Sequence, residues 1–143
     1  MNSVNKSWKL IKTVLPQHTD HAGVMWHGTY LNWLEESRID SLLQAGINYF
    51  ELVKINFEIP VIALEINYFS PCFLGDEITI NSYYKFSNSP KLLIESEFLN
   101  KEKKILTKAA VYLTLIKKDK FSVARKRPEF IQNAFNKLNE GPN

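Results

Sequence analysis

The chain has 143 residues, 45% hydrophobic and 23% charged, which is the usual balance of one folded domain. Its 18 basic and 15 acidic residues leave a net charge of +3, which suits a small anionic ligand at least as well as nucleic acid. No run of about 18 apolar residues occurs, so the sequence predicts no membrane span. Residues 1–12 contain no apolar stretch typical of a signal peptide, and the single cysteine, Cys72, cannot form an internal disulfide. We therefore expect a cytoplasmic protein with no membrane and no nucleic-acid partner.

The first half of the chain predicts one strand and one long helix. A roughly alternating apolar stretch indicates a strand over residues 8–14, and a polar loop follows over residues 16–23. From His27 the apolar side chains take helical spacing, which continues to Ala45, with Gly46 as a C-terminal cap. This is the only long helix expected before the C-terminal tail.

Strand composition and turn residues dominate the rest of the chain. A short connection over residues 48–56 follows the helix, and turn segments then separate the apolar runs. The strands expected there cover residues 59–69, 77–86, 92–99 and 105–116. A basic segment over residues 117–127 precedes a short terminal helix over residues 128–138, with Pro128 in its first turn.

One long helix cannot be packed away from these strands, because nothing else would cover its apolar face. The simplest arrangement is one antiparallel sheet of about five strands wrapped around the helix, which is an α+β fold. The prediction is a single domain over residues 1–143 with a basic C-terminal extension from about residue 118. The exposed edges and outer face of such a sheet favour dimerisation.

All three histidines of the chain lie in one short segment just before and at the start of the long helix, with Asp20 among them. The first N–H groups of a helix have no partner within the helix and carry partial positive charge. A carbonyl placed there is polarised, while Asp20 attacks it or activates a water molecule against it. Gly23 and Gly28 let a ligand approach the backbone closely. Because the histidines lack the paired spacing of a zinc motif, we expect no metal.

A longer pattern extends from this loop into the helix. It consists of an Asp, then Gly-Val and an aromatic residue, a His, Tyr-Leu, a second aromatic residue, Glu and Arg. Its positions are Asp20, Gly23, Val24, Met25, Trp26, His27, Tyr30, Leu31, Trp33, Leu34, Glu35 and Arg38. A second signature over residues 66–80 has a Tyr shortly before a Pro, followed by Gly-Asp. Over about residues 8–117 the chain resembles the 4-hydroxybenzoyl-CoA thioesterase family.

The resemblance implies a hot-dog fold in which each active site lies between the protomers of a homodimer, with dimers usually joined into a homotetramer. It implies hydrolysis of an acyl-CoA or acyl-carrier-protein thioester to a free acid and a thiol, with no cofactor, since coenzyme A is part of the substrate. Asp20 matches the catalytic position, as nucleophile or general base. His27 matches a position whose backbone N–H binds the thioester oxygen and whose side chain could assist hydrolysis. The substrate-binding residues implied are Gly23, Val24, Trp26, Tyr30 and Lys91.

Two positions depart from the family pattern, since His18 replaces an acidic residue and Thr29 replaces an Asn. Both leave the subfamily and the acyl group open, so an aromatic and a short aliphatic acyl group both fit. The residues that could line the acyl pocket are Trp26, Tyr30, Phe57 and Tyr68. By the same resemblance, Lys91 would contact the phosphates of coenzyme A.

A non-hydrolytic acyl-CoA-binding protein or a hydratase/dehydratase of the same fold is the alternative, because one fold hosts several chemistries. Dehydratases of this fold rely on a His and a helix carboxylate, so the loop carboxylate of Asp20 favours hydrolysis. Glu35 and Arg38, three apart on the helix, are expected to form a structural ion pair. Cys72 is expected to be a buried or interface thiol.

Overall fold

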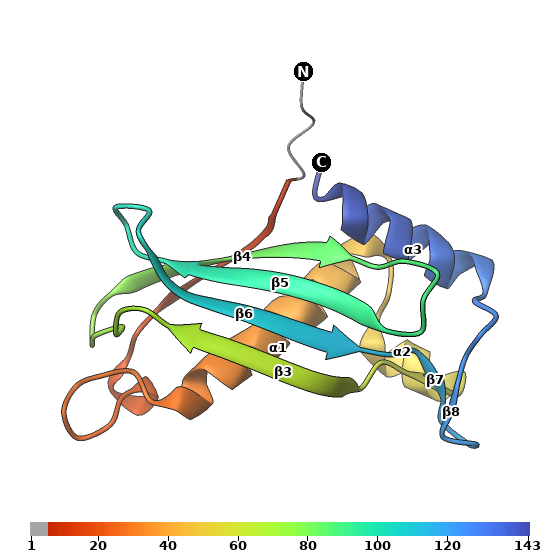
Figure 1. The fold of residues 1–143 in the computed structure, drawn as a ribbon, viewed down its shortest axis with the longest axis horizontal. Helices are drawn as coiled ribbons and strands as arrows, with labels where there is room; N and C mark the ends of the chain where they lie inside the picture. Colours follow the sequence, from red (N-terminus) through yellow and green to blue (C-terminus); the bar gives the residue numbers. More distant parts are fainter. Residues whose placement is uncertain (1–5) are drawn as a thin grey trace.

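One long helix lies across one face of a five-stranded antiparallel sheet (Figure 1). The computed structural model describes residues 6–143, so part of the N-terminal segment lies outside the described residues. The helix is α1 (His27–Ala45). Across the sheet, the strands are β1 (Trp8–Thr13), β4 (Glu77–Lys85), β5 (Leu92–Leu99), β6 (Ile105–Leu113) and β3 (Val61–Tyr68). This arrangement confirms the predicted α+β fold of one sheet and one long central helix.

The connection after α1 contains a short helix that the sequence prediction lacked. Asn48 Oδ1 accepts the backbone N–H of Phe50 at 3.0 Å and that of Glu51 at 3.3 Å, and thereby caps this helix. The remaining elements are η1 (Pro16–His18), α2 (Tyr49–Lys54), β2 (Phe57–Glu58), β7 (Ile116–Lys117), β8 (Ser122–Val123) and α3 (Glu129–Glu140). The strands β2, β7 and β8 form a separate three-stranded sheet beside α2.

β1 and β4 each end one residue before the predicted bound, and β3 and β6 are each three residues shorter than predicted. β3 begins at Val61 rather than at residue 59, because Pro60 has no backbone N–H to donate to the sheet. The long strand expected to reach residue 116 ends at Leu113, and β7 then pairs with β2 in the smaller sheet. The chain therefore leaves the main sheet earlier than the apolar run suggests.

The core lies between α1 and the sheet. On β4, alternate side chains face the helix, and Ile78 and Ile80 are completely buried. Leu42 of α1 and Phe98 of β5 are buried with them, while α3 adds Phe135 at the end of the sheet. Among residues 6–143, no helix combines the length and the apolar character needed to cross a bilayer.

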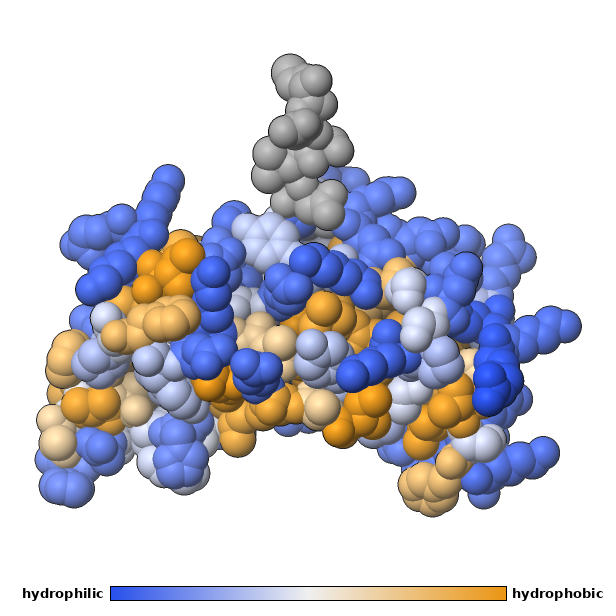
Figure 2. Space-filling model, in the orientation of Figure 1, coloured by the Kyte–Doolittle hydropathy of each residue, from blue (hydrophilic) through white to orange (hydrophobic). Residues whose placement is uncertain are grey.

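β3 forms an open edge of the sheet with apolar side chains still exposed. Val61, Ile62, Leu64 and Tyr68 are each 42–52% exposed. Figure 2 shows apolar side chains along the lower rim of the molecule, where β3 lies. An unpaired strand edge is a template for pairing with another chain, so this edge offers both backbone and apolar contacts to a partner.

Candidate active site

The first turn of α1 presents backbone donors that nothing in the described chain accepts. Trp26 precedes the helix with extended backbone and supplies no side-chain cap. Within residues 6–143, the N–H groups of His27 and Gly28 have no hydrogen-bond acceptor. Such groups carry the partial positive charge of the helix N-terminus. They can therefore bind an anion or the polarised oxygen of a carbonyl.

The loop before α1 is tied to the segment that follows β3. The Met25 N–H donates to the Cys72 carbonyl at 2.8 Å, and the Leu74 N–H donates to the Gly23 carbonyl at 3.0 Å. Gly23 has a φ of 78°, in the left-handed region that glycine adopts without strain. These contacts fix the position of the loop relative to the start of α1.

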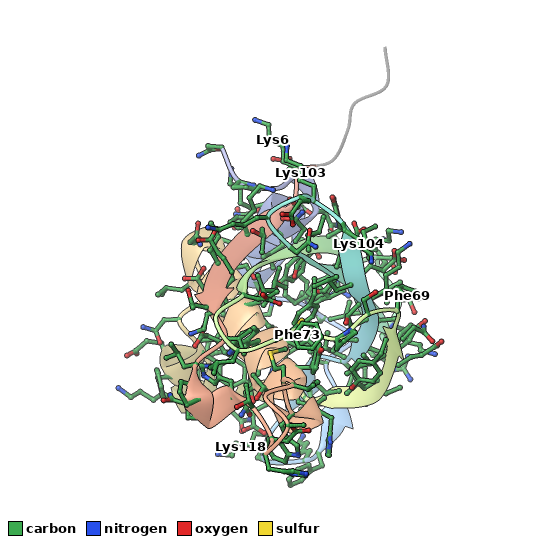
Figure 3. The ribbon with its side chains drawn as sticks, turned by 90° about the vertical axis from the view of Figure 1, so that its left-hand side faces the viewer. Lys6, Phe69, Phe73, Lys103, Lys104 and Lys118 are labelled. Carbon is green, nitrogen blue, oxygen red and sulfur yellow. The ribbon has the colours of Figure 1, made fainter. Side chains whose placement is uncertain are left out.

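A groove of about 380 Å³ lies beside the start of α1. Its lining residues are Val24, Met25, His27, Tyr30, Tyr68, Phe69, Ser70 and Pro71. The buried Tyr30 ring packs edge-on against the Tyr68 ring, with centroids 5.0 Å apart. Figure 3 views this end of the molecule, where the exposed Phe69 and Phe73 lie. A mostly apolar groove beside open amides suits an acyl group joined to a reactive carbonyl.

Asp20 lies on the exposed side of the loop, next to the groove but outside its lining. Its Oδ1 accepts the N–H of Ala22 at 2.8 Å and that of Val24 at 3.3 Å. Its own N–H donates to the Val24 carbonyl at 2.9 Å, which keeps Asp20 beside a residue of the groove. The sequence suggested a carboxylate directed at the amides of α1, whereas in this chain it is bonded to amides of its own loop.

The other residues singled out from the sequence lie at different places around the groove. His27, Val24 and Tyr30 line it, and the glycine at 23 is held in the loop beside it. The Trp26 side chain is 49% exposed and stacks at a tilt on the His27 ring, outside the lining. Phe57 is buried in the smaller sheet and does not line the groove.

Lys91 is not brought to this site within one chain. It immediately precedes β5, and its Nζ lies over the Tyr112 ring, 4.4 Å from the centroid. Phe98, near the other end of β5, is the residue that contacts Tyr30, with ring centroids 5.3 Å apart. An eight-residue strand spans roughly 26 Å. Lys91 and the groove therefore lie at opposite ends of the sheet.

Tyr30 and Cys72 form a buried polar contact behind the groove. The Tyr30 hydroxyl donates to Cys72 Sγ at 3.5 Å. Burial raises the pKa of the Tyr30 phenol and also that of the Cys72 thiol. Both groups therefore stay protonated near neutral pH, and the prediction of a buried thiol at Cys72 is confirmed.

His18 has a structural role. Its Nδ1 accepts the Leu15 N–H at 3.0 Å, and its ring meets the Trp33 ring edge-on, with centroids 5.2 Å apart. Within the described part of the chain, no three His, Cys, Asp or Glu side chains gather as a metal site. Sequence reasoning had no signal for this arrangement, because the Trp33 contact crosses from loop to helix.

Comparison with known proteins identifies the family. The model of the thioesterase-like superfamily matches residues 14–135. The Synechocystis sp. protein sll0410 is 38% identical over 81 residues, which cover 56% of this chain and 49% of that protein. A 1,4-dihydroxy-2-naphthoyl-CoA hydrolase of Prochlorococcus marinus is 32% identical over 98 residues, or 63% of this chain and 61% of the relative. These matches thus span only about half to three fifths of the relatives' lengths.

The fold is shared with solved thioesterases. The structure of Slr0204, a 1,4-dihydroxy-2-naphthoyl-CoA thioesterase from Synechocystis, superimposes with a TM-score of 0.83 at 20% identity, over 92% of this chain and 97% of that one. This likeness confirms the predicted hot-dog fold, and the family match covers most of the chain. The chain belongs to the thioesterase-like superfamily.

Proposed function

We propose that this chain hydrolyses an acyl-CoA or acyl-carrier-protein thioester to a free acid and a thiol. The observation that carries the proposal is the pair of open N–H groups at His27 and Gly28 beside an apolar groove, in a member of a thioesterase superfamily. These donors would bind the thioester oxygen and stabilise the oxyanion that forms on attack. The groove would hold the first part of the acyl group against Tyr30.

In this proposal Asp20 is the catalytic carboxylate, acting as nucleophile or as general base toward water. Two loop amides already bond one of its oxygens, Oδ1, and within residues 6–143 the other oxygen has no hydrogen-bond donor. That free oxygen is the one available to attack the carbonyl or to take a proton from water. The His27 side chain, which is exposed and lines the groove, would assist at the leaving thiol.

We further propose that the active unit is a homodimer joined through β3. The groove includes Tyr68, at the end of the same open strand edge that carries Ile62 and Leu64. Antiparallel pairing of two β3 strands about a two-fold axis would extend the sheet and bring the partner to the groove. Two such dimers would form the homotetramer. Any contact of Lys91 with coenzyme A at this groove would come from a partner protomer.

A substrate screen tests the proposal directly. Purified protein is offered aromatic, short aliphatic and longer acyl-CoA thioesters, and one acyl-carrier-protein thioester, while a thiol reagent records release of the thiol. We expect turnover of at least one class without added metal or cofactor. Hydration of crotonyl-CoA without thiol release would instead support the hydratase alternative. We also propose a cytoplasmic location, which cell fractionation tests.

A further inference from the structure

A second hollow, distinct from the groove, lies between α1 and the sheet. It has a volume of about 190 Å³, more than the roughly 150 Å³ that suffices for an apolar cavity to bind benzene. Its lining residues are Leu31, Leu34, Glu35, Arg38, Val61, Leu64, Ser82, Tyr84, Ile94, Ser96 and Val111. In one chain Leu31, Val61 and Leu64 are 42–46% exposed, so the hollow opens on the β3 side of the helix, which the partner of the proposed homodimer would cover.

Its inner wall carries a row of buried hydroxyl groups. Ser82 Oγ and Ser96 Oγ lie 2.8 Å apart on the neighbouring strands β4 and β5, and Ser37 Oγ lies 3.4 Å from Ser82 Oγ. All three serines are at most 4% exposed. Each hydroxyl can donate one hydrogen bond and accept two, so these three serines can still form further hydrogen bonds. The hydroxyls bond one another, and Ser82 and Ser96, which line the hollow, can in addition bond an oxygen of a ligand held there.

Arg38 limits the far end of the hollow. Its side chain is buried, its Nη1 donates to the Ile59 carbonyl at 3.1 Å, and its Nη2 lies 3.5 Å from Glu35 Oε1, so the predicted ion pair is present. These contacts hold the guanidinium in place and keep its charge compensated. Ser82 and Ser96, which can still form hydrogen bonds, are therefore the part of the wall suited to a neutral polar group.

The groove and this hollow follow one another along the same two elements. Along α1 the groove is lined by His27 and Tyr30, and the hollow begins one residue later at Leu31. Along β3 the groove takes Tyr68 and the hollow takes Leu64. An acyl group whose carbonyl sits at the start of α1 and which extends along the helix would therefore run toward the hydroxyl row.

The distance from His27 to the serine hydroxyls sets the length of the acyl group that can reach them. Ser37, bonded to Ser82, lies ten residues after His27, or roughly 15 Å along the helix at 1.5 Å per residue. Because each C–C bond is about 1.5 Å long and an extended chain zigzags, about ten to twelve carbons span this distance. A single aromatic ring attached to the carbonyl would end well before the serines.

Building on the proposed thioesterase function, we infer that this hollow receives the far end of a medium-chain acyl group, and that Ser82 and Ser96 bind an oxygen-bearing substituent there. The inferred substrate class is a medium-chain acyl thioester with a hydroxyl at or near its terminus. The two serines would then determine specificity without taking part in the chemical step.

The test compares dodecanoyl-CoA with its ω-hydroxylated analogue, measured as the ratio of the two kcat/KM values. We expect the wild type to prefer the hydroxylated chain, and Ser82→Ala and Ser96→Ala each to lower that ratio about tenfold, the effect of one lost hydrogen bond. Ser89→Ala, on the exposed connection between β4 and β5, is the matched control and should keep the wild-type ratio. A ratio near one in the wild type, or no change in either variant, would overturn the inference.

A second variant tests the hollow without touching the hydroxyl row. Leu31→Trp adds bulk at a half-exposed helix position between the groove and the hollow. It should lower kcat/KM for dodecanoyl-CoA at least tenfold relative to butyryl-CoA. An unchanged ratio would show that the acyl chain does not enter. If the ratio is unchanged but all variants still hydrolyse butyryl-CoA, this inference fails and the proposed function stands. If the wild type hydrolyses no thioester at all, the proposed function itself is refuted.

Discussion

Replacing His27 with proline should remove one oxyanion donor and leave the fold intact. His27 is the first residue of α1, a position at which proline is well tolerated because the N–H has no partner within the helix. The preceding residue, Trp26, has φ −71° and ψ 142°, which lies in the extended region that a residue before proline prefers. The substitution therefore deletes an unpaired N–H with no lost backbone hydrogen bond in the described chain.

The expected effect on catalysis is large and specific. Losing one oxyanion donor typically lowers kcat by about 10²- to 10³-fold. The free energy of unfolding should stay within about 1 kcal/mol of the wild type, because proline at a compatible position mainly restricts the unfolded chain. His27→Ala is the matched control, since it removes the same imidazole and keeps the N–H.

The assay is thiol release under saturating acyl-CoA, paired with urea unfolding of each variant. If His27→Pro and His27→Ala lose activity equally, the side chain rather than the backbone donor matters. If His27→Pro keeps wild-type kcat and stability, the amides of α1 do not bind the thioester oxygen, and the reasoning fails.

Three further predictions concern the first turn of α1, the Cys72 thiol and the open edge of β3. A Cβ on Gly28 would lie 2.2 Å from the indole of Trp26, so Gly28→Ala should displace this flexible, exposed ring; Trp fluorescence should change while the melting temperature shifts little. Burial raises the pKa of the Cys72 thiol, so as the pH rises the unfolded chain loses the thiol proton before the folded chain does. The free energy of unfolding should therefore fall above pH 9, and Cys72→Ala should lessen that fall. Ile62→Asp places a charge on the open edge of β3, so analytical ultracentrifugation should show dissociation to monomers with loss of activity; a fully active dimer would exclude that interface.

Local signals in the sequence predicted the central helix and the alternating strands well. The apolar spacing from His27 to Ala45 and the glycine after it define α1, because helix periodicity and a left-handed cap are both local properties. The short helix after it was missed because six residues give too little periodicity, although Asn48 is a recognisable cap. The strands β7 and β8, two residues each, carry no alternating pattern at all.

The features of the site that the sequence did not predict depend on contacts between distant segments of the chain. Ser82 and Ser96 come together only through the register of β4 with β5, which no pattern within either strand specifies. Arg38 was expected in a structural ion pair; its burial and its bond to Ile59 depend on where β3 begins. The loop of Asp20 folds back on itself through hydrogen bonds that no residue pattern specifies.

The most direct test of the whole account is the turnover of Asp20→Asn beside the wild type on the best acyl-CoA substrate. Asparagine keeps the side-chain oxygen that accepts the two loop amides, so the loop and the fold should be preserved. We expect kcat to fall by about 10²- to 10⁴-fold, the usual contribution of a positioned acid or base. Wild-type turnover by a folded Asp20→Asn protein would contradict the central claim that this carboxylate performs the hydrolysis.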